Sequence, residues 1–175
     1  MKNFLTVILL ALMSMTASAQ SYLGGSLGLG YDFDSKSVNF TLSPEYGYNL
    51  NSKWAVGGTL TYSYQGEQEV NIFALQPYAR YTFAKVADDK LHFFCDGTVG
   101  FGLIAVKHED TGALWQIGFR PGMSYSLNNH WSIVAHLGFL GYNGANEEAQ
   151  DIGYHNRFGF DFGSLNLSFG VYYSF

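Results

Sequence analysis

Apolar and polar positions alternate without interruption along residues 165–175. The odd positions are all apolar or aromatic, and the even positions carry small or polar side chains. Because successive side chains of a β-strand point to opposite sides, this segment predicts a strand with one wholly apolar face. A soluble β-sandwich can contain one such strand, so the rest of the chain decides between a soluble and a membrane fold.

The same alternation recurs along most of the chain, and the apolar face of each segment is rich in aromatic rings. The eight segments that show it are 22–31, 37–50, 54–64, 71–83, 91–105, 114–127, 131–142 and 165–175. In the seventh segment we assign Ile133, Leu137 and Phe139 to the outer face. A soluble sandwich does not explain an aromatic face on nearly every strand, whereas the lipid-facing wall of a barrel does. The sequence therefore predicts an all-β fold, an eight-stranded antiparallel up-and-down transmembrane β-barrel.

The connections between these segments alternate in character. Residues 49–53, 84–90 and 128–130 form polar turns, whereas 107–112 and 143–155 are more acidic, and 143–155 is the longest of the five. In an even-stranded barrel the short turns and both chain ends lie on the periplasmic side, and the longer loops lie outside. We therefore expect the two acidic connections to be external.

Three tryptophans lie near the predicted ends of strands. Trp54 and Trp131 follow predicted periplasmic turns, and Trp115 follows a predicted external loop. Tryptophan is enriched where the hydrocarbon core of a membrane meets water. We therefore assign all three to an interfacial girdle.

The first 19 residues have the layout of a secretory signal peptide. Lys2 precedes an apolar run over residues 4–13, and small residues at 17–19 form the expected cleavage site. The run is shorter than the roughly 20 residues of a spanning helix, which disfavours the alternative of a membrane anchor. We expect residues 1–19 to be removed and residues 20–175 to form one outer-membrane barrel domain.

Composition excludes further classes of protein. Hydrophobic residues make up 47% of the chain and charged residues only 13%, which argues against a long disordered tail. The net charge of −5 and the lack of a basic stripe exclude an electrostatic nucleic-acid binder. Cys95 is the only cysteine, so an internal disulfide is impossible, and its position predicts a thiol on the outer face.

Four charged residues fall on inward-facing positions of the predicted strands: Glu45, Arg80, Asp96 and Arg120. An eight-stranded barrel has room inside for side chains but not for a porin-like channel. Because a lone buried charge is very costly, we expect these ions to pair with one another and fill the lumen. The alternative is a gated, narrow ion path that opens when the pairs rearrange.

Patterns typical of an enzyme are missing. His155 lies near Glu147, Glu148 and Asp151, but Asn156 follows it, and the histidine–serine arrangement that a lipid A deacylase needs is not found. Nothing resembles a catalytic triad, a Gly-rich phosphate loop or a paired zinc motif. We expect a solvated acidic loop without metal or cofactor, with divalent-cation bridging to lipopolysaccharide as the alternative. The remaining histidines are dispersed, and we assign structural roles to them: His92, His130 and His136.

The C-terminal octet is the most specific motif in the chain. Ser168 and Gly170 supply its polar and glycine positions, and Tyr173 and Phe175 supply aromatic rings at the third-last and last positions. In this arrangement the octet resembles the assembly signal of outer-membrane barrels. The resemblance implies recognition by the barrel-assembly machinery during biogenesis.

Three proline-containing segments also resemble one another, and each runs toward a predicted periplasmic turn: 42–48, 76–83 and 120–125. With the octet, they make the chain after residue 19 similar to the small outer-membrane barrel family that includes the OmpA-like and OmpX-like barrels. Such a resemblance implies an outer-membrane location. It does not fix an activity, because one fold serves many functions.

The expected function is that of a non-enzymatic integral outer-membrane barrel with a structural or surface-interaction role through its external loops and no open pore. One alternative is a narrow conduit or a carrier of small hydrophobic ligands, and a further one is a rim enzyme that acts on lipid A. Expected partners are outer-membrane lipids, lipopolysaccharide, the assembly machinery, and a host or surface ligand at the loops. Nucleic acid is not among them.

Overall fold

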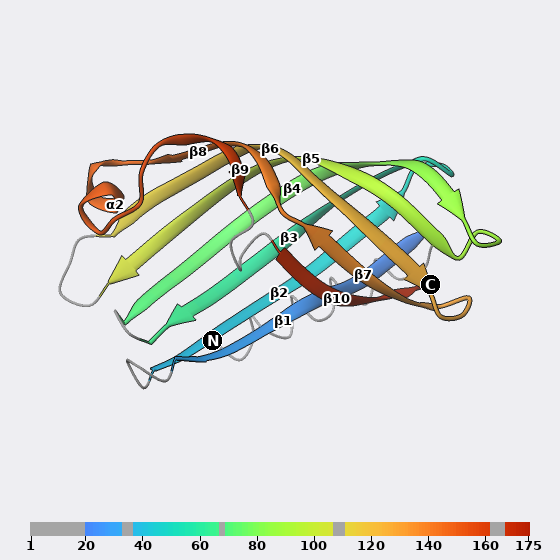
Figure 1. The fold of residues 1–175 in the computed structure, drawn as a ribbon, viewed down its shortest axis with the longest axis horizontal. Helices are drawn as coiled ribbons and strands as arrows, with labels where there is room; N and C mark the ends of the chain where they lie inside the picture. The colour runs from blue at the N-terminus through green and yellow to red at the C-terminus, as the bar shows by residue number, and fades with distance from the viewer. Residues whose placement is uncertain (1–19, 33–36, 67–68, 107–110, 162–166) are drawn as a thin grey trace, which may run out of the picture.

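The computed structural model describes residues 20–32, 37–66, 69–106, 111–161 and 167–175. In Figure 1 these residues form one sheet that curves round on itself. The predicted signal peptide, residues 1–19, lies outside the described residues, so its removal stays a prediction.

The described residues form ten strand segments and one short helix. In chain order these are β1 (Ser21–Asp32), β2 (Ser37–Asn49), β3 (Trp54–Gln65), β4 (Val70–Val86), β5 (Leu91–Val106), β6 (Gly112–Ser126), β7 (Trp131–Leu137), β8 (Phe139–Ala145), α2 (Glu147–Asp151), β9 (Arg157–Asp161) and β10 (Leu167–Ser174). Within these ranges, the helix is too short and too polar to cross a membrane.

Ten segments make eight wall strands because two wall strands are interrupted. β7 and β8 both pair with β6, and β9 and β10 are successive pieces of the last wall strand. Neighbouring strands are antiparallel, and the pairing of β5 with β6 closes the sheet. The predicted fold is confirmed: the chain is a closed eight-stranded antiparallel β-barrel. We call the end with the short β2–β3, β4–β5 and β6–β7 connections the turn end, and the end that carries α2 the loop end (Figure 1).

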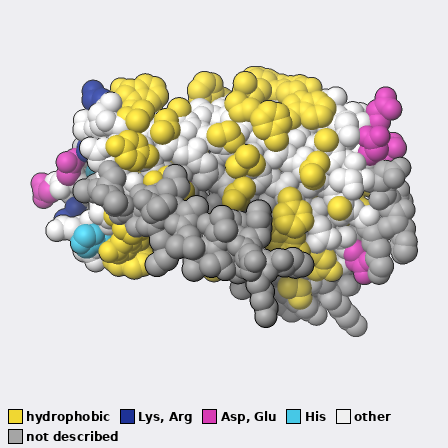
Figure 2. Space-filling view, turned by 180° about the vertical axis from the view of Figure 1, so that it is seen from behind, with side chains coloured by type: hydrophobic (Ala, Val, Ile, Leu, Met, Phe, Trp, Pro, Cys, Tyr) yellow, Lys and Arg dark blue, Asp and Glu magenta, His cyan; other side chains and the backbone are white. Residues whose placement is uncertain are grey.

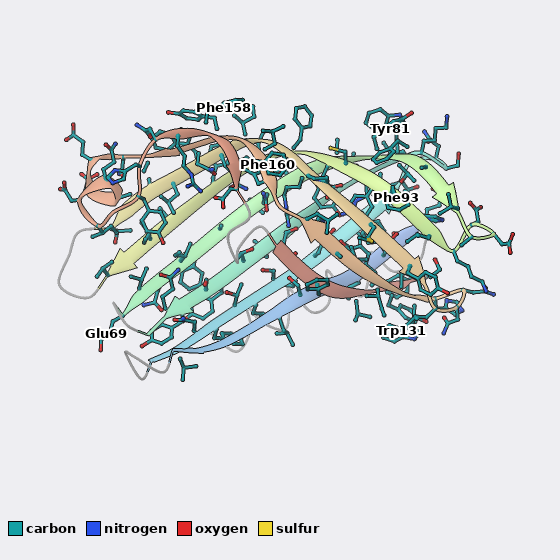
Figure 3. The ribbon with its side chains drawn as sticks, in the orientation of Figure 1. Glu69, Tyr81, Phe93, Trp131, Phe158 and Phe160 are labelled. Atoms are coloured by element: carbon teal, nitrogen blue, oxygen red, sulfur yellow. The ribbon has the colours of Figure 1, made fainter. Side chains whose placement is uncertain are left out.

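The outer wall carries the apolar faces that the alternation predicts. Leu60, Phe73 and Phe101, on the three successive strands β3, β4 and β5, are each more than half exposed. Figure 2 shows hydrophobic side chains along the length of the visible wall, with charged side chains gathered at the two ends. Tyr81 and Phe158 point away from the barrel in Figure 3. The surface between the two ends is therefore an apolar belt, which is the surface that lipid covers in a transmembrane barrel.

The seventh wall strand departs from simple alternation at Gly138, between β7 and β8. On β6, two residues separate Phe119 from Gly122, whereas three residues separate their partners His136 and Leu140. Gly138 has a φ of 117°, a conformation that residues with a Cβ atom rarely adopt. The extra residue forms a β-bulge, and a one-residue shift exchanges the two faces of a strand.

Phe139 is buried inside the barrel because of this bulge. The prediction that it faces outward is therefore wrong, since the alternation restarts with opposite phase after Gly138. The ring of Phe139 lies against Gly118 and Gly141, where an added Cβ atom would come within 2.8 and 2.7 Å of the ring. Two glycines on neighbouring strands thus leave the space that the inward-turned ring needs.

We expect Gly138→Ala to lower the free energy of unfolding by about 1–3 kcal/mol, because alanine is strained at a φ of 117°. Urea unfolding in detergent micelles measures the change. Gly159→Ala is the matched control, since that glycine has open space around its Cα; we expect a change within about 0.5 kcal/mol there. Equal losses in both variants would contradict a strained bulge.

The segment after β8 is a packed cap rather than a fully solvated loop. Its buried cluster, shared with three strands, consists of Val70, Ile72, Ile104, Ala145 and Ala149. Ala149 of α2 is fully buried and lies against Gly112, and Asn146 caps the helix by accepting a hydrogen bond from the Ala149 amide at 3.1 Å. The acidic side chains of the segment are exposed, as expected: Glu147, Glu148 and Asp151. The expectation of a solvated loop is corrected in part, because the apolar residues of this segment pack against β4 and β5.

Candidate functional site

The centre of the lumen is filled by a buried guanidinium with two carboxylates. The Nε of Arg80 donates to Oδ1 of Asp96 at 2.7 Å, and Nη2 donates to Oδ2 of Asp96 at 2.9 Å. The same Nη2 donates to Oε1 of Glu45 at 3.2 Å. All three side chains are buried, with 6%, 1% and 6% exposure for Arg80, Asp96 and Glu45. Such an arrangement is sustained only when each buried ion is matched by an opposite charge and hydrogen bonds.

Aromatic residues surround this ion group. The hydroxyl of Tyr78 donates to Oε1 of Glu45 at 2.5 Å and lies 2.7 Å from the hydroxyl of Tyr22. The guanidinium of Arg80 lies 3.9 Å from the centre of the Phe94 ring, a cation–π contact. Together with Tyr172, whose hydroxyl accepts from Arg80 at 3.3 Å, these rings occupy the lumen around the ions.

His136 belongs to the same group, although the sequence assigned it only a structural role. Its Nε2 lies 3.1 Å from Oδ2 of Asp96 and 3.4 Å from Nη2 of Arg80. The signal that could have identified it is parity, meaning that every second residue of a strand faces the lumen. His136 and the buried Val134 fall on the same side of β7. We call these eight residues the lumen cluster: Tyr22, Glu45, Tyr78, Arg80, Phe94, Asp96, His136 and Tyr172.

Arg120, the fourth charge predicted to face the lumen, is buried there but stands apart from the lumen cluster. It is the cross-strand partner of Asp96 in the β5–β6 pairing, yet the Asp96 carboxylate turns to Arg80 and His136. Nη1 of Arg120 donates to Oε1 of Gln76 at 2.9 Å. Among the described residues, no carboxylate oxygen lies within 4.0 Å of this guanidinium. The structure thus brings three of the four predicted ions together.

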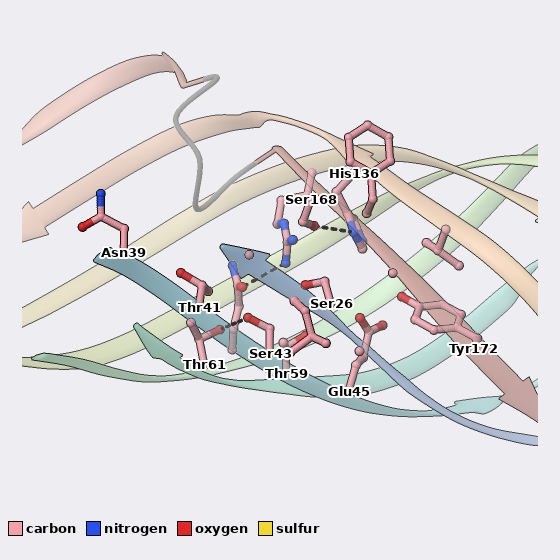
Figure 4. Close-up of a pocket in the computed structure, with 18 residues that line it drawn as sticks. Ser26, Asn39, Thr41, Ser43, Glu45, Thr59, Thr61, His136, Ser168 and Tyr172 are labelled. Atoms are coloured by element: carbon pink, nitrogen blue, oxygen red, sulfur yellow. Dashed lines mark hydrogen bonds between the residues drawn. The ribbon is translucent and has the colours of Figure 1, made fainter. Parts of the chain in front are cut away.

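The described residues line three cavities that bear on the lumen. The polar cavity, about 430 Å³, is lined by Glu45, Arg120 and several hydroxyl side chains, as Figure 4 shows for Thr41, Thr59 and Thr61. The loop-end cavity, about 400 Å³, is lined partly by the segment after α2. The turn-end cavity, about 470 Å³, is lined on one side by Arg80.

The lumen cluster separates the polar cavity from the turn-end cavity. Glu45 faces the first and Arg80 faces the second, and the two are hydrogen-bonded to each other. Tyr172 lines both cavities, with its ring between them. In contrast, the polar and loop-end cavities share two lining residues, Thr61 and Gln76. Within the described residues, the lumen cluster therefore lies between the polar and turn-end cavities, whereas the polar and loop-end cavities adjoin each other.

The three tryptophans assigned to the girdle lie on the outer wall near strand ends. Trp54 begins β3 and packs against Tyr81, with ring centres 4.9 Å apart. Trp131 begins β7 and packs edge-on against Tyr173 at 5.1 Å. Trp115 is the fourth residue of β6, at the loop end. Two of the three are thus at the turn end and one at the loop end.

The four positions of the predicted assembly signal lie on or next to β10. Ser168 and Gly170 line the polar cavity, and Gly170 lies so close to the backbone of Gly25 that a Cβ atom would meet its carbonyl oxygen at 2.5 Å. Tyr173 faces outward and packs against Phe175 at 5.1 Å between ring centres. The Phe175 amide donates to the carbonyl of Ser21 at 3.1 Å, so the chain end is tied to β1.

The described ranges show no cluster of metal-ligating side chains: they contain no group of three or more His, Cys, Asp or Glu side chains placed to hold a metal ion. Asn156, beside the exposed His155, accepts a hydrogen bond from the Ala145 amide at 2.8 Å and so holds the cap segment to β8. Cys95 is partly exposed on β5, and no disulfide partner exists in the sequence.

Comparison with known proteins gives one family and several similar folds. The family described as outer membrane protein beta-barrel domain matches residues 4–175. The crystal structure of Neisserial surface protein A matches with 16% identity and a TM-score of 0.54, over 90% of this chain and 98% of that one. The Yersinia pestis outer membrane protein Ail, in a phospholipid bilayer nanodisc, matches with 14% identity and a TM-score of 0.49, over 90% and 100% of the two chains. No curated protein matches the chain. The structural likeness shows a shared fold, and the family match indicates an outer-membrane location.

Proposed function

Since this chain belongs to the outer membrane protein beta-barrel family, we propose that it is a non-enzymatic barrel of the outer membrane that acts at the cell surface through its loop end. Its lumen carries no open pore. The observation that carries the proposal is the lumen cluster, in which Arg80 holds Glu45 and Asp96 between aromatic rings. Side chains fill the narrow interior of an eight-stranded barrel in this way, so solutes have no continuous path.

Planar-bilayer recording tests the closed lumen. We expect no resolved conductance steps from the wild-type barrel, and none from Arg80→Ala, because four aromatic rings of the lumen cluster remain in place. Arg157→Ala, which removes an exposed arginine at the loop end, is the matched control. Steps that appear only in Arg80→Ala would favour the alternative of a gated conduit.

The orientation of the barrel is tested by labelling intact cells with a membrane-impermeant maleimide. In a Cys95→Ala background, we expect Glu148→Cys in α2 to react and Asn51→Cys in the β2–β3 turn to react only after the cells are broken. Both residues are exposed, and they lie at opposite ends of the barrel. The reagent therefore distinguishes them only by the side of the membrane that they face. Reaction at position 51 in intact cells would reverse the proposed orientation.

The remaining partners follow from the surfaces of the barrel. Lipid chains cover the apolar belt, and the exposed acidic side chains of α2 lie where lipopolysaccharide or a host ligand can meet them. Export by the signal peptide and recognition of β10 by the assembly machinery complete the proposed biogenesis. The loop end supports a surface role because its cap is folded, which fixes the exposed acidic side chains on a stable base.

A further inference from the structure

Three buried polar atoms of the described residues have no hydrogen-bond partner, and all three belong to residues that line the polar cavity. They are Oγ1 of Thr59, Nε2 of Gln76 and Nε of Arg120. The side chains are 5%, 9% and 6% exposed. Buried polar groups are almost always satisfied, so three exceptions around one cavity point to something that fills it.

The chemistry of these atoms defines what can fill the cavity. The guanidinium Nε and the amide Nε2 only donate hydrogen bonds, and the Thr59 hydroxyl can donate as well. Thr59 and Gln76 are direct partners in the β3–β4 pairing, so their side chains leave the wall next to each other. Arg120 is joined to the same Gln76 through Nη1. Three unsatisfied hydrogen-bond donors that face one cavity indicate that it holds a hydrogen-bond acceptor, and the usual acceptor is an oxygen atom.

Charge points to an anionic acceptor. Among the described residues, Arg80 is hydrogen-bonded to the carboxylates of both Glu45 and Asp96, whereas Arg120 is hydrogen-bonded to the neutral amide of Gln76 and to no carboxylate. Glu45 also lines the polar cavity, but its Oε1 already accepts from Tyr78 and Arg80. The planar edge of a guanidinium matches the two oxygens of a carboxylate.

The cavity has the size and the access of a binding site. Its volume of about 430 Å³ is in the range of small-molecule pockets. Thr61 and Gln76 line both this cavity and the loop-end cavity, so the approach is from the loop end. The lumen cluster closes the opposite side. A molecule that enters can bind and leave again but cannot pass through.

We propose that the polar cavity binds a small carboxylate-bearing molecule, held by Arg120, Gln76 and Thr59 and admitted from the loop end. This site is additional to the proposed surface role and does not depend on it. Binding without passage also agrees with a barrel that does not conduct.

The arginine Nε–H signals of the folded barrel in detergent micelles provide a direct test by nuclear magnetic resonance. The chain has three arginines, Arg80, Arg120 and Arg157, and loss of one signal in Arg120→Lys and one in Arg157→Lys assigns them. We expect sodium acetate, at ionic strength held constant with sodium chloride, to shift the Arg120 signal saturably and leave the other two in place. Acetamide, the neutral analogue, should bind at least about tenfold more weakly, because charge-assisted hydrogen bonds are stronger.

Variants test the two neutral donors. We expect Thr59→Val and Gln76→Leu each to weaken acetate binding about fivefold or more. Thr41→Val is the matched control, since its hydroxyl lines the same cavity but is already bonded to Ser63 at 2.9 Å. Equal binding of acetamide, equal shifts at all three arginines, or no shift at all would overturn the proposal and leave ordered water as the content of the cavity. The comparison of acetate with acetamide uses the wild-type barrel, so it decides the question even if a variant fails to fold.

Discussion

Arg80→Met is expected to lower the free energy of unfolding by about 3–5 kcal/mol, because it leaves two buried carboxylates without their cation. Arg80 makes three hydrogen bonds to Glu45 and Asp96 and stacks on Phe94. Methionine replaces the apolar stem of the arginine but makes none of the polar bonds of the guanidinium. Urea unfolding in detergent micelles, followed by tryptophan fluorescence, measures the loss.

Two further variants make this result specific to the buried charges. Arg157→Met removes an exposed partner of Asp161 and should change stability by no more than about 0.5 kcal/mol. The triple variant Glu45→Gln, Arg80→Met, Asp96→Asn removes all three charges together, and we expect it to recover part of the loss, because no carboxylate of the lumen cluster is then left without its cation. If Arg80→Met were as mild as Arg157→Met, the two carboxylates of the lumen cluster would not depend on Arg80.

The barrel could be predicted because alternate residues of every strand face lipid and the lumen. Side chains toward lipid are apolar, and those toward the lumen are polar or small. Phe73 is exposed and Ile72 and Gln76 are buried, as the parity of β4 requires. The same reasoning assigned the strand boundaries at the turn end closely: β3 and β5 begin at Trp54 and Leu91, the residues expected.

Parity fails where the chain gains a residue or where a strand is short. The bulge at Gly138 reverses the phase of the seventh wall strand, and a lone glycine in the sequence does not reveal whether it forms a bulge. β9 was missed because its five residues offer only Phe158 and Phe160 as apolar positions, too few to distinguish a strand from a loop. Both departures lie in the last third of the chain, where the wall strands are interrupted.

The inward position of the charges was predictable, but their partners were not. Parity alone assigned Glu45, Arg80, Asp96 and Arg120 to the lumen. Which ions meet depends on how side chains from strands distant in sequence reach across the interior, as Arg80 and Glu45 do over 35 residues. Asp96 has an arginine as direct cross-strand partner on both sides, Arg80 on β4 and Arg120 on β6, and the pairing alone does not tell that the carboxylate bonds to Arg80.

The second large effect on the free energy of unfolding is expected in the apolar belt. Phe119 lies at the middle of β6, on the outer face, and is 58% exposed. We expect Phe119→Arg to lower the free energy of unfolding in phospholipid vesicles by about 2–4 kcal/mol, because a guanidinium at the middle of the hydrocarbon core is costly. Tryptophan fluorescence during urea unfolding of vesicle-inserted protein measures it.

Leu127→Arg is the matched control for Phe119→Arg. Leu127 is 55% exposed and follows the end of β6, where the membrane meets water. The cost of arginine falls to about 0–1 kcal/mol at the interface, so the two variants should differ although their exposures match. A soluble barrel would tolerate arginine equally at both positions, because both side chains would face water. A depth-dependent cost therefore identifies lipid as the solvent of the aromatic face, and equal costs would exclude a membrane-spanning belt.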